Sequence, residues 1–394
     1  MNREQKTFRL EIWRGASDGV LQATAKPFAL LVAVKLFDVS DALKALISAA
    51  PFIGHIFALW YSARFANSRF SKSALAAVPM GVSAAGTAAI LFVNEGFAYA
   101  LWITFAIMCS SLRLPFMSAI YEENYAAERR GRLFSTALTL SIVTAFICHF
   151  AFGKLLDVDL RNYRHVIIFT AFAGVVGTVA TALIPASSPQ QEGARNPLRN
   201  LSLVWKHKLF GYVLALWFLT GLANLWVLPL KVVYLAEKER GLNLSPQLVM
   251  LLVGVIPEIA RLIFTRIWAG IFDRTNFIKV RMLVNLFLAM GIPLFFLTDN
   301  IFIIGLGSFL QGVALAGARL AWNLWVTRLA PENQSHVYMS IHIFFTGVRG
   351  TFAPLIGFWY LNYFPIRFVG LISTCLICAA TLLLLPLLKM GKRF

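Results

Sequence analysis

The stretch that decides the fold is residues 257–274, PEIARLIFTRIWAGIFDR. Its unusual residues correspond to those of an earlier stretch, residues 51–67, PFIGHIFALWYSARFAN. The offset between the two stretches is 206 positions. The residues that correspond at this offset are Pro51 and Pro257, Asn67 and Asp273, and the pairs Arg113-Leu114 and Arg319-Leu320. A repeat of this length exceeds a solenoid unit and matches one six-helix half of a membrane protein. We therefore expect two related halves.

The composition indicates a membrane protein. Hydrophobic residues make up 59% of the 394 residues and charged residues only 14%. Apolar runs of about 20 residues, the length that crosses a bilayer core, fill most of the chain. They predict twelve spans, at residues 16–37, 42–63, 73–93, 97–120, 132–154, 164–184, 209–234, 246–270, 277–298, 301–327, 335–361 and 364–388. The expected fold is an all-α membrane protein with twelve transmembrane helices in two pseudo-symmetric six-helix halves.

One connection between the spans is long enough to be a linker. It is polar, contains Pro189 and Pro197, and carries several basic residues. The expected domains are an N-terminal half at residues 1–185, a cytoplasmic linker at 186–208 and a C-terminal half at 209–394.

The net charge of +18 would suggest nucleic-acid binding in a soluble chain, but its distribution indicates membrane topology. Most of the 36 Lys and Arg lie on the side that holds both termini and the linker. Positive residues concentrate in cytoplasmic loops, so both termini are expected in the cytoplasm. We expect an integral protein of a bacterial inner membrane, with no cleavable signal peptide and no nucleic-acid partner.

Signals for an enzyme are absent from the sequence. The four cysteines fall within apolar spans, where core packing is the commoner role. No phosphate-binding glycine loop, nucleophile–base pair or cluster of metal ligands is found. We expect no catalysis, no cofactor and no metal.

The third, sixth, ninth and twelfth spans carry no Lys, Arg, Asp or Glu in their apolar parts. A charge inside a membrane needs protein or water beside it, whereas an uncharged helix can face lipid all round. Every third helix is therefore expected at the periphery, and the other eight are expected to enclose a polar interior.

These features together resemble the major facilitator superfamily over essentially the whole chain. The family's Gly-x-x-x-Asp-Arg signature is present in loose form at residues 270–274, and its first copy is degenerate at residues 63–68, where an asparagine replaces the acid. The resemblance implies alternating access and a cytoplasmic gate at these loops, formed by Asn67, Arg132, Asp273 and Arg274. The usual signatures of drug–proton antiporters, an arginine early in helix 4 and Gly-Pro in helix 5, are missing, which disfavours a standard multidrug antiporter.

Cationic and polar residues on the inner spans are the candidates for substrate binding. They are Lys26, Arg113, Asn224, Arg319, Asn323 and Arg349. Arg113 and Arg319 occupy corresponding positions in the repeat and could form a clamp for a carboxylate or phosphate. The alternative is that each binds helix carbonyls or extends to the membrane interface.

Titratable residues on the second span of each half are the candidates for proton coupling. Glu258 and Arg261 lie one turn apart beside Pro257, and His55 occupies the position equivalent to Arg261. The alternative is that Glu258 and Arg261 form a purely structural ion pair. Asp18 lies four residues after Arg14, and we expect these two to form a surface pair.

The sequence thus predicts a secondary active transporter for a small anionic or zwitterionic organic solute, coupled to protons. Uniport or anion exchange also suits an excess of fixed cations. Two alternatives stay open: an exporter of a lipid or amphiphilic compound, and a non-transporting receptor or scaffold. The expected partners are the solute, protons and the lipid bilayer, and we expect a monomer.

Overall fold

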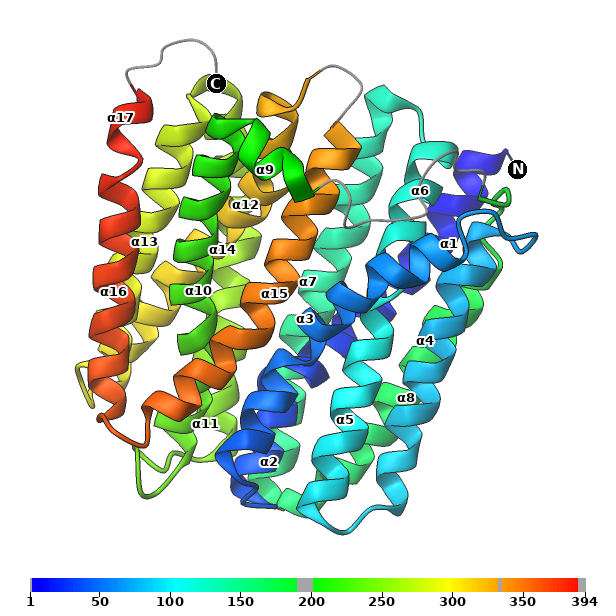
Figure 1. Ribbon diagram of the computed structural model, residues 1–394. Coiled ribbons are helices and arrows are strands. Elements are labelled where there is room, and N and C mark those ends of the chain that lie inside the picture. The colour runs from blue at the N-terminus through cyan, green and yellow to red at the C-terminus, as the bar shows by residue number, and fades with distance from the viewer. Residues whose placement is uncertain (1, 190–200, 332–334, 389–394) are drawn as a thin grey trace. The chain divides into compact units, whose positions relative to one another are not determined.

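The computed structural model describes residues 2–189, 201–331 and 335–388. The chain divides into two compact units, Met1–Pro197 and Leu198–Phe394. The regular structure of the described residues is helical throughout (Figure 1). The all-α fold expected from the sequence is confirmed.

The first unit contains six membrane-spanning segments, some of them built from two helices. In chain order its helices are α1 (Arg3–Ala23), α2 (Ala29–Lys35), α3 (Asp41–Arg64), α4 (Lys72–Ala89), α5 (Gly96–Ser111), α6 (Leu114–Asn124), α7 (Ala127–Val158) and α8 (Tyr163–Ala182). The first span comprises α1 and α2, and the fourth comprises α5 and α6.

The first span begins earlier than its hydropathy predicted. We expected it from residue 16, but α1 begins at Arg3. Asn2 accepts a hydrogen bond from the backbone nitrogen of Gln5, whose side chain accepts one from the backbone of Asn2 in return. This capping box satisfies free amide groups at the helix start, so polar residues extend the helix beyond its apolar part.

Two spans of the first unit are interrupted at charged residues. Between α1 and α2, Thr24–Phe28 forms a π turn in which Lys26 is non-helical, immediately before Pro27. Between α5 and α6, Arg113 precedes a helix with proline in its first turn. Proline cannot donate a backbone hydrogen bond, and it restricts the residue before it. These breaks place the backbone at Lys26 and Arg113 outside the regular helices.

The second unit repeats this order of spans. Its helices are α9 (Leu203–Lys206), α10 (Lys208–Ala236), α11 (Pro246–Met250), α12 (Ile256–Arg274), α13 (Phe277–Phe296), α14 (Ile301–Leu329), α15 (Ser335–Tyr360), α16 (Ile366–Leu382) and α17 (Leu385–Leu388). A π turn at Leu251–Val255 joins α11 to α12. Pro51 lies in the second span of its unit and Pro257 in the second span of the other. Arg113 and Arg319 likewise belong to the two fourth spans.

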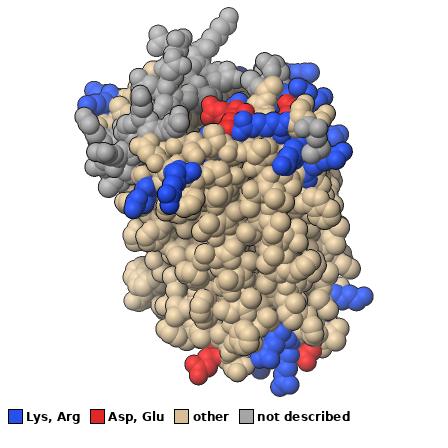
Figure 2. Space-filling model, turned by 90° about the vertical axis from the view of Figure 1, so that its right-hand side faces the viewer, with Lys and Arg blue, Asp and Glu red and all other residues tan. Residues whose placement is uncertain are grey.

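The surface has the character of a membrane protein. Eleven helices of the described residues are long and apolar enough to cross a membrane. The first span, which carries Glu11, Arg14 and Asp18, is the twelfth. Figure 2 shows a broad band without charged residues between two ends where Lys, Arg, Asp and Glu gather. Such a band fits the hydrocarbon core of a bilayer.

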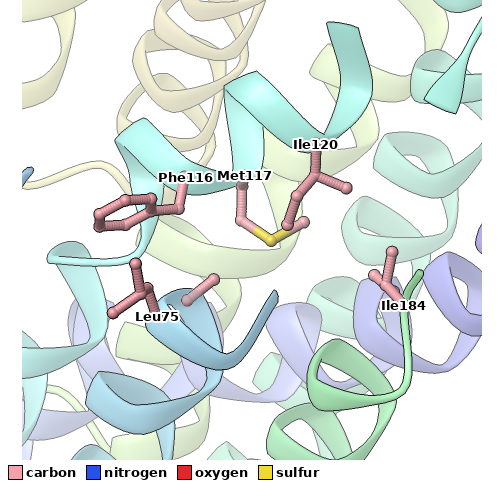
Figure 3. Close-up of a cluster of buried hydrophobic side chains, with 6 residues drawn as sticks. Leu75, Phe116, Met117, Ile120 and Ile184 are labelled. Carbon is pink, nitrogen blue, oxygen red and sulfur yellow. The ribbon is translucent and has the colours of Figure 1, made fainter. Parts of the chain in front are cut away.

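A cluster of buried side chains holds α6 in the first unit. Phe116, Met117 and Ile120 of α6 pack with Leu75 of α4 and with Ile184, which follows α8 (Figure 3). Close packing of these side chains fixes α6 against its neighbours. It therefore also fixes the polar residues that α6 presents to α1.

Candidate functional site

Arg349 is a buried cation in the interior of the second unit. It lies in α15, is 6% exposed, and donates through Nη1 to the carbonyl oxygen of Trp217 in α10, at 2.5 Å. Gly221 lies one turn after Trp217, and a methyl group there would collide with the guanidinium of Arg349. The absence of a side chain at Gly221 therefore makes the room that Arg349 occupies.

Arg281 contacts the same tryptophan from another helix. It lies five residues into the ninth span, α13, and is 6% exposed. Its guanidinium carbon lies 4.1 Å from the ring centre of Trp217, which is a close cation–π contact. Arg281 was not singled out from the sequence, because it lies near the start of a span whose apolar part carries no charge. The structure shows that it is buried.

His342 completes the arrangement from α15. It is fully buried, and its ring lies edge-on to Trp217 at 5.9 Å and to Trp325 at 5.1 Å between ring centres. Neither ring nitrogen has a hydrogen-bond partner among the described residues. A buried imidazole without a partner is costly, and a ligand with hydrogen-bonding oxygens would satisfy it.

Trp217, Arg281, His342 and Arg349 are called the Trp217 cluster below. Among the described side chains, no carboxylate forms an ion pair with either arginine. Arginine stays protonated in proteins, and each buried, unpaired ion costs several kcal/mol. The cation–π contact and the Trp217 carbonyl offset part of this cost. The remaining positive charge makes the cluster a candidate anion-binding site.

A second charged group joins α1 to α6 in the first unit. Arg14 donates to both oxygens of Glu11, at 2.6 and 2.8 Å, and to Asp18. Tyr121 of α6 donates to Glu11 at 2.9 Å and accepts from Arg14 at 2.8 Å. Arg113 lies 2.7 Å from Asp18. The surface pair expected between Arg14 and Asp18 is present but buried, which corrects its expected location.

The α1–α6 group is electrically balanced, unlike the Trp217 cluster. Its two carboxylates face two arginines, so Arg113 is already compensated by Asp18. Arg319, its counterpart in the repeat, is exposed on α14. The anion clamp predicted from these two arginines stays a prediction.

The remaining candidates for substrate binding lie in different settings. Lys26 is exposed at the break in the first span and interacts electrostatically with His55. His55 is partly buried in α3 and packs edge-on to Phe52. Asn224 lies partly buried on α10, one turn beyond Gly221. The side chain of Asn323 lies outside the described residues.

Glu258 and Arg261 form the ion pair expected from their spacing. Nη1 of Arg261 donates to both carboxylate oxygens of Glu258, at 2.5 and 2.7 Å. The two side chains are 13% and 12% exposed, so the pair is partly accessible. This geometry suits a structural pair as well as a carboxylate that releases its partner on protonation.

The residues of the predicted gate are mostly exposed. Asn67 lies in the turn between α3 and α4, and Arg132 and Arg274 are exposed on their helices. The side chain of Asp273 lies outside the described residues, so its predicted capping role stays a prediction.

Glu123 makes the contacts at this end of the first unit. It accepts from Nζ of Lys72 at 2.9 Å and from the backbone nitrogen of Ser187 at 3.0 Å, and it pairs with Arg3. One carboxylate thus ties together the starts of α1 and α4 and the segment after α8. Sequence reasoning missed Glu123 because its partners lie far away along the chain.

Comparisons with known proteins agree with this architecture. The sequence profile described as Major Facilitator Superfamily matches residues 19–354. The fold is similar to the nucleoside transporter NupG (TM-score 0.73, 13% identity), covering 99% of this chain and 100% of that one. It is similar to a D-xylose-proton symporter (TM-score 0.71, 17% identity; 97% and 96% covered). A POT family transporter in complex with a thioalcohol conjugated peptide gives a TM-score of 0.74 at 13% identity, with 99% and 96% covered. No curated protein sequence matches the chain. Identities this low show a shared fold alone.

Proposed function

Since the chain belongs to the Major Facilitator Superfamily, we propose that it is a secondary active transporter that carries a small anionic or zwitterionic organic solute. In such transporters two helical halves expose one site alternately to each side of the membrane.

The Trp217 cluster carries the proposal. Arg281 and Arg349 are both buried, and no described carboxylate pairs with either of them. An anion entering this site would gain charge-assisted hydrogen bonds and relieve the cost of the buried cations. Lys26, Arg113, Asn224, Arg319 and Asn323 are kept as proposed substrate-binding residues on the sequence pattern.

Coupling to protons is the second part of the proposal. Glu258 would take up the proton, Arg261 would hold its ionised form, and His55 would serve as a further titratable group. The partial exposure of the Glu258–Arg261 pair supports this role, because protons must reach the carboxylate. The similarity of the fold to a protein named as a D-xylose-proton symporter also supports the proposal of proton coupling.

The cellular setting is proposed from the charge pattern. Positive residues gather on the side of the termini and the linker, which favours a cytoplasmic location for both termini. We place the protein in a bacterial inner membrane and expect it to act as a monomer. Asn67, Arg132, Asp273 and Arg274 are proposed to form the gate on the cytoplasmic side.

Uptake of a panel of labelled metabolites into proteoliposomes, at defined pH on each side, tests the proposal. Anionic or zwitterionic members of the panel are expected to accumulate. For the solute found, Arg349→Gln should weaken binding by about 1.5–3 kcal/mol, the usual loss for a hydrogen bond to a charged group.

The matched control is Arg367→Gln, which removes an exposed arginine of the same unit that pairs with Asp299. It should leave binding unchanged. Transport restricted to neutral or cationic solutes, or equal binding by the Arg349 variant and the parent protein, would contradict the proposal.

A further inference from the structure

We infer that the Trp217 cluster binds a doubly charged anionic group, of the kind carried by a small organic phosphate. This inference rests on the proposed function and specifies the class of substrate.

The charge of the cluster requires two negative charges for neutrality. Arg281 and Arg349 are each 6% exposed, and the described residues supply no carboxylate to either one. A singly charged ligand would leave one buried cation uncompensated. A phosphate monoester carries a charge of about −1.5 to −2 at neutral pH, which matches the two guanidinium groups.

Both guanidinium groups are held against one residue. Arg281 lies over the ring of Trp217, and Arg349 donates to the carbonyl oxygen of the same residue. The two arginines also interact electrostatically with each other and with His342. A single ligand group bound beside Trp217 would therefore interact with Arg281, Arg349 and His342.

The donors of the cluster are largely unused. Stacking on an indole occupies the face of the Arg281 guanidinium and leaves the N–H groups in its plane available. Nε of Arg349 has no partner within the described part of the chain, and neither ring nitrogen of His342 has one, so the N–H of its imidazole is also unused. A phosphate group offers three strong acceptor oxygens, more than a carboxylate, for donors that converge from different helices.

A third buried cation of the same unit lies apart from these two arginines. Lys231 of α10 is 5% exposed, and its Nζ lies 5.4 Å from the ring centre of Phe295. No described contact joins it to the Trp217 cluster. Lys231 therefore provides a control for the removal of a buried positive charge elsewhere in the unit.

The test measures anion binding to the purified full-length chain in detergent, by calorimetry at constant ionic strength. The probes are sulfate and inorganic phosphate as multiply charged oxyanions, and nitrate and benzoate as singly charged anions. Sulfate and phosphate should bind at least about tenfold more tightly than nitrate, which corresponds to about 1.4 kcal/mol. Arg281→Gln and Arg349→Gln should each abolish this preference, and Lys231→Met should keep it.

A charge-preserving variant distinguishes the loss of the positive charge from a loss of folding. Arg281→Lys retains the positive charge and should retain the preference for sulfate over nitrate even if overall affinity falls. Equal affinities for sulfate and nitrate, or a preference that survives both glutamine variants, would overturn the inference.

The outcomes also separate this inference from the proposed function. Suppose that benzoate uptake depends on both arginines but the protein does not prefer sulfate to nitrate in binding. The inference of a doubly charged ligand would then be wrong, while the proposed function as a transporter of anions would be kept. If binding and uptake of every anion are unchanged in both arginine variants, the inference and the proposed function are both wrong.

Discussion

Nη2 of Arg113 lies 2.7 Å from Oδ1 of Asp18, so the fourth span of the first unit is joined to the first span by a largely buried ion pair. The same carboxylate also accepts from Arg14. An arginine predicted to face the substrate is thus compensated within its own unit. Arg281 and Arg349 have no such partner among the described side chains, which is why we propose the anion site there.

Removing Asp18 should show how much this ion pair contributes to the stability of the protein. Asp18→Asn leaves Arg113, whose side chain is only 13% exposed, without its counter-charge and should destabilise the protein by up to about 3–5 kcal/mol, the usual range for a broken buried pair. Thermal unfolding in detergent measures the effect. The double variant Asp18→Asn with Arg113→Gln should be more stable than the sum of the single effects predicts, with a coupling of about 0.5–3 kcal/mol. Additive effects would show that the pair contributes nothing.

Gly221 should be sensitive to a single methyl group. Gly221→Ala places that group where the guanidinium of Arg349 lies, so the arginine must move. The variant should lose stability and anion affinity together, as measured by thermal unfolding and calorimetry. Gly131→Ala is the control, because nothing lies within 4 Å of a methyl group there, and alanine should stabilise that helix by up to about 1 kcal/mol. A Gly221 variant that matches this control would contradict the assigned packing of Arg349.

Glu123 should stabilise the local structure of three segments at one end of the first unit. Glu123→Gln removes the charge that binds Arg3 and Lys72. Hydrogen exchange should accelerate at the start of α1 and around Ser187, where the lost contacts end. Glu122→Gln, which changes the exposed neighbouring carboxylate, should leave exchange unaltered. Equal exchange in the two variants would count against the role of Glu123.

Glu258 should separate coupling from binding. In the Glu258→Gln variant, exchange of solute across the membrane should persist while uphill accumulation driven by a pH gradient is lost, because only the proton step is removed. Asp299→Asn, which changes an exposed acid of the same unit, should accumulate solute normally. Both rates are measured in proteoliposomes. Retained accumulation by the Glu258 variant would make its pair with Arg261 structural.

The spans could be predicted from the sequence because membrane helices need about 20 apolar residues, and hydropathy detects them directly. The start of α1 was missed because its first turns are polar and are held by a capping box and by Glu123. Arg349 was found because it lies in the middle of a span. Arg281 was missed because it lies near a helix end, where hydropathy cannot distinguish an arginine that points inward from one at the surface. Its burial depends on Trp217, which is remote in the sequence.

The charges of the first span have a consequence for how the chain enters the membrane. With Glu11, Arg14 and Asp18 on one helix, α1 is a poor substrate for insertion by itself, since charged residues oppose transfer into lipid. Tyr121, which binds Arg14, lies 107 residues later, and Arg113 belongs to the same fourth span. The first helix synthesised therefore gains its polar partners only after the fourth span has been made. Its stable integration during biosynthesis awaits the arrival of the fourth span, and a chain truncated before Arg113 should leave α1 unstable in the bilayer.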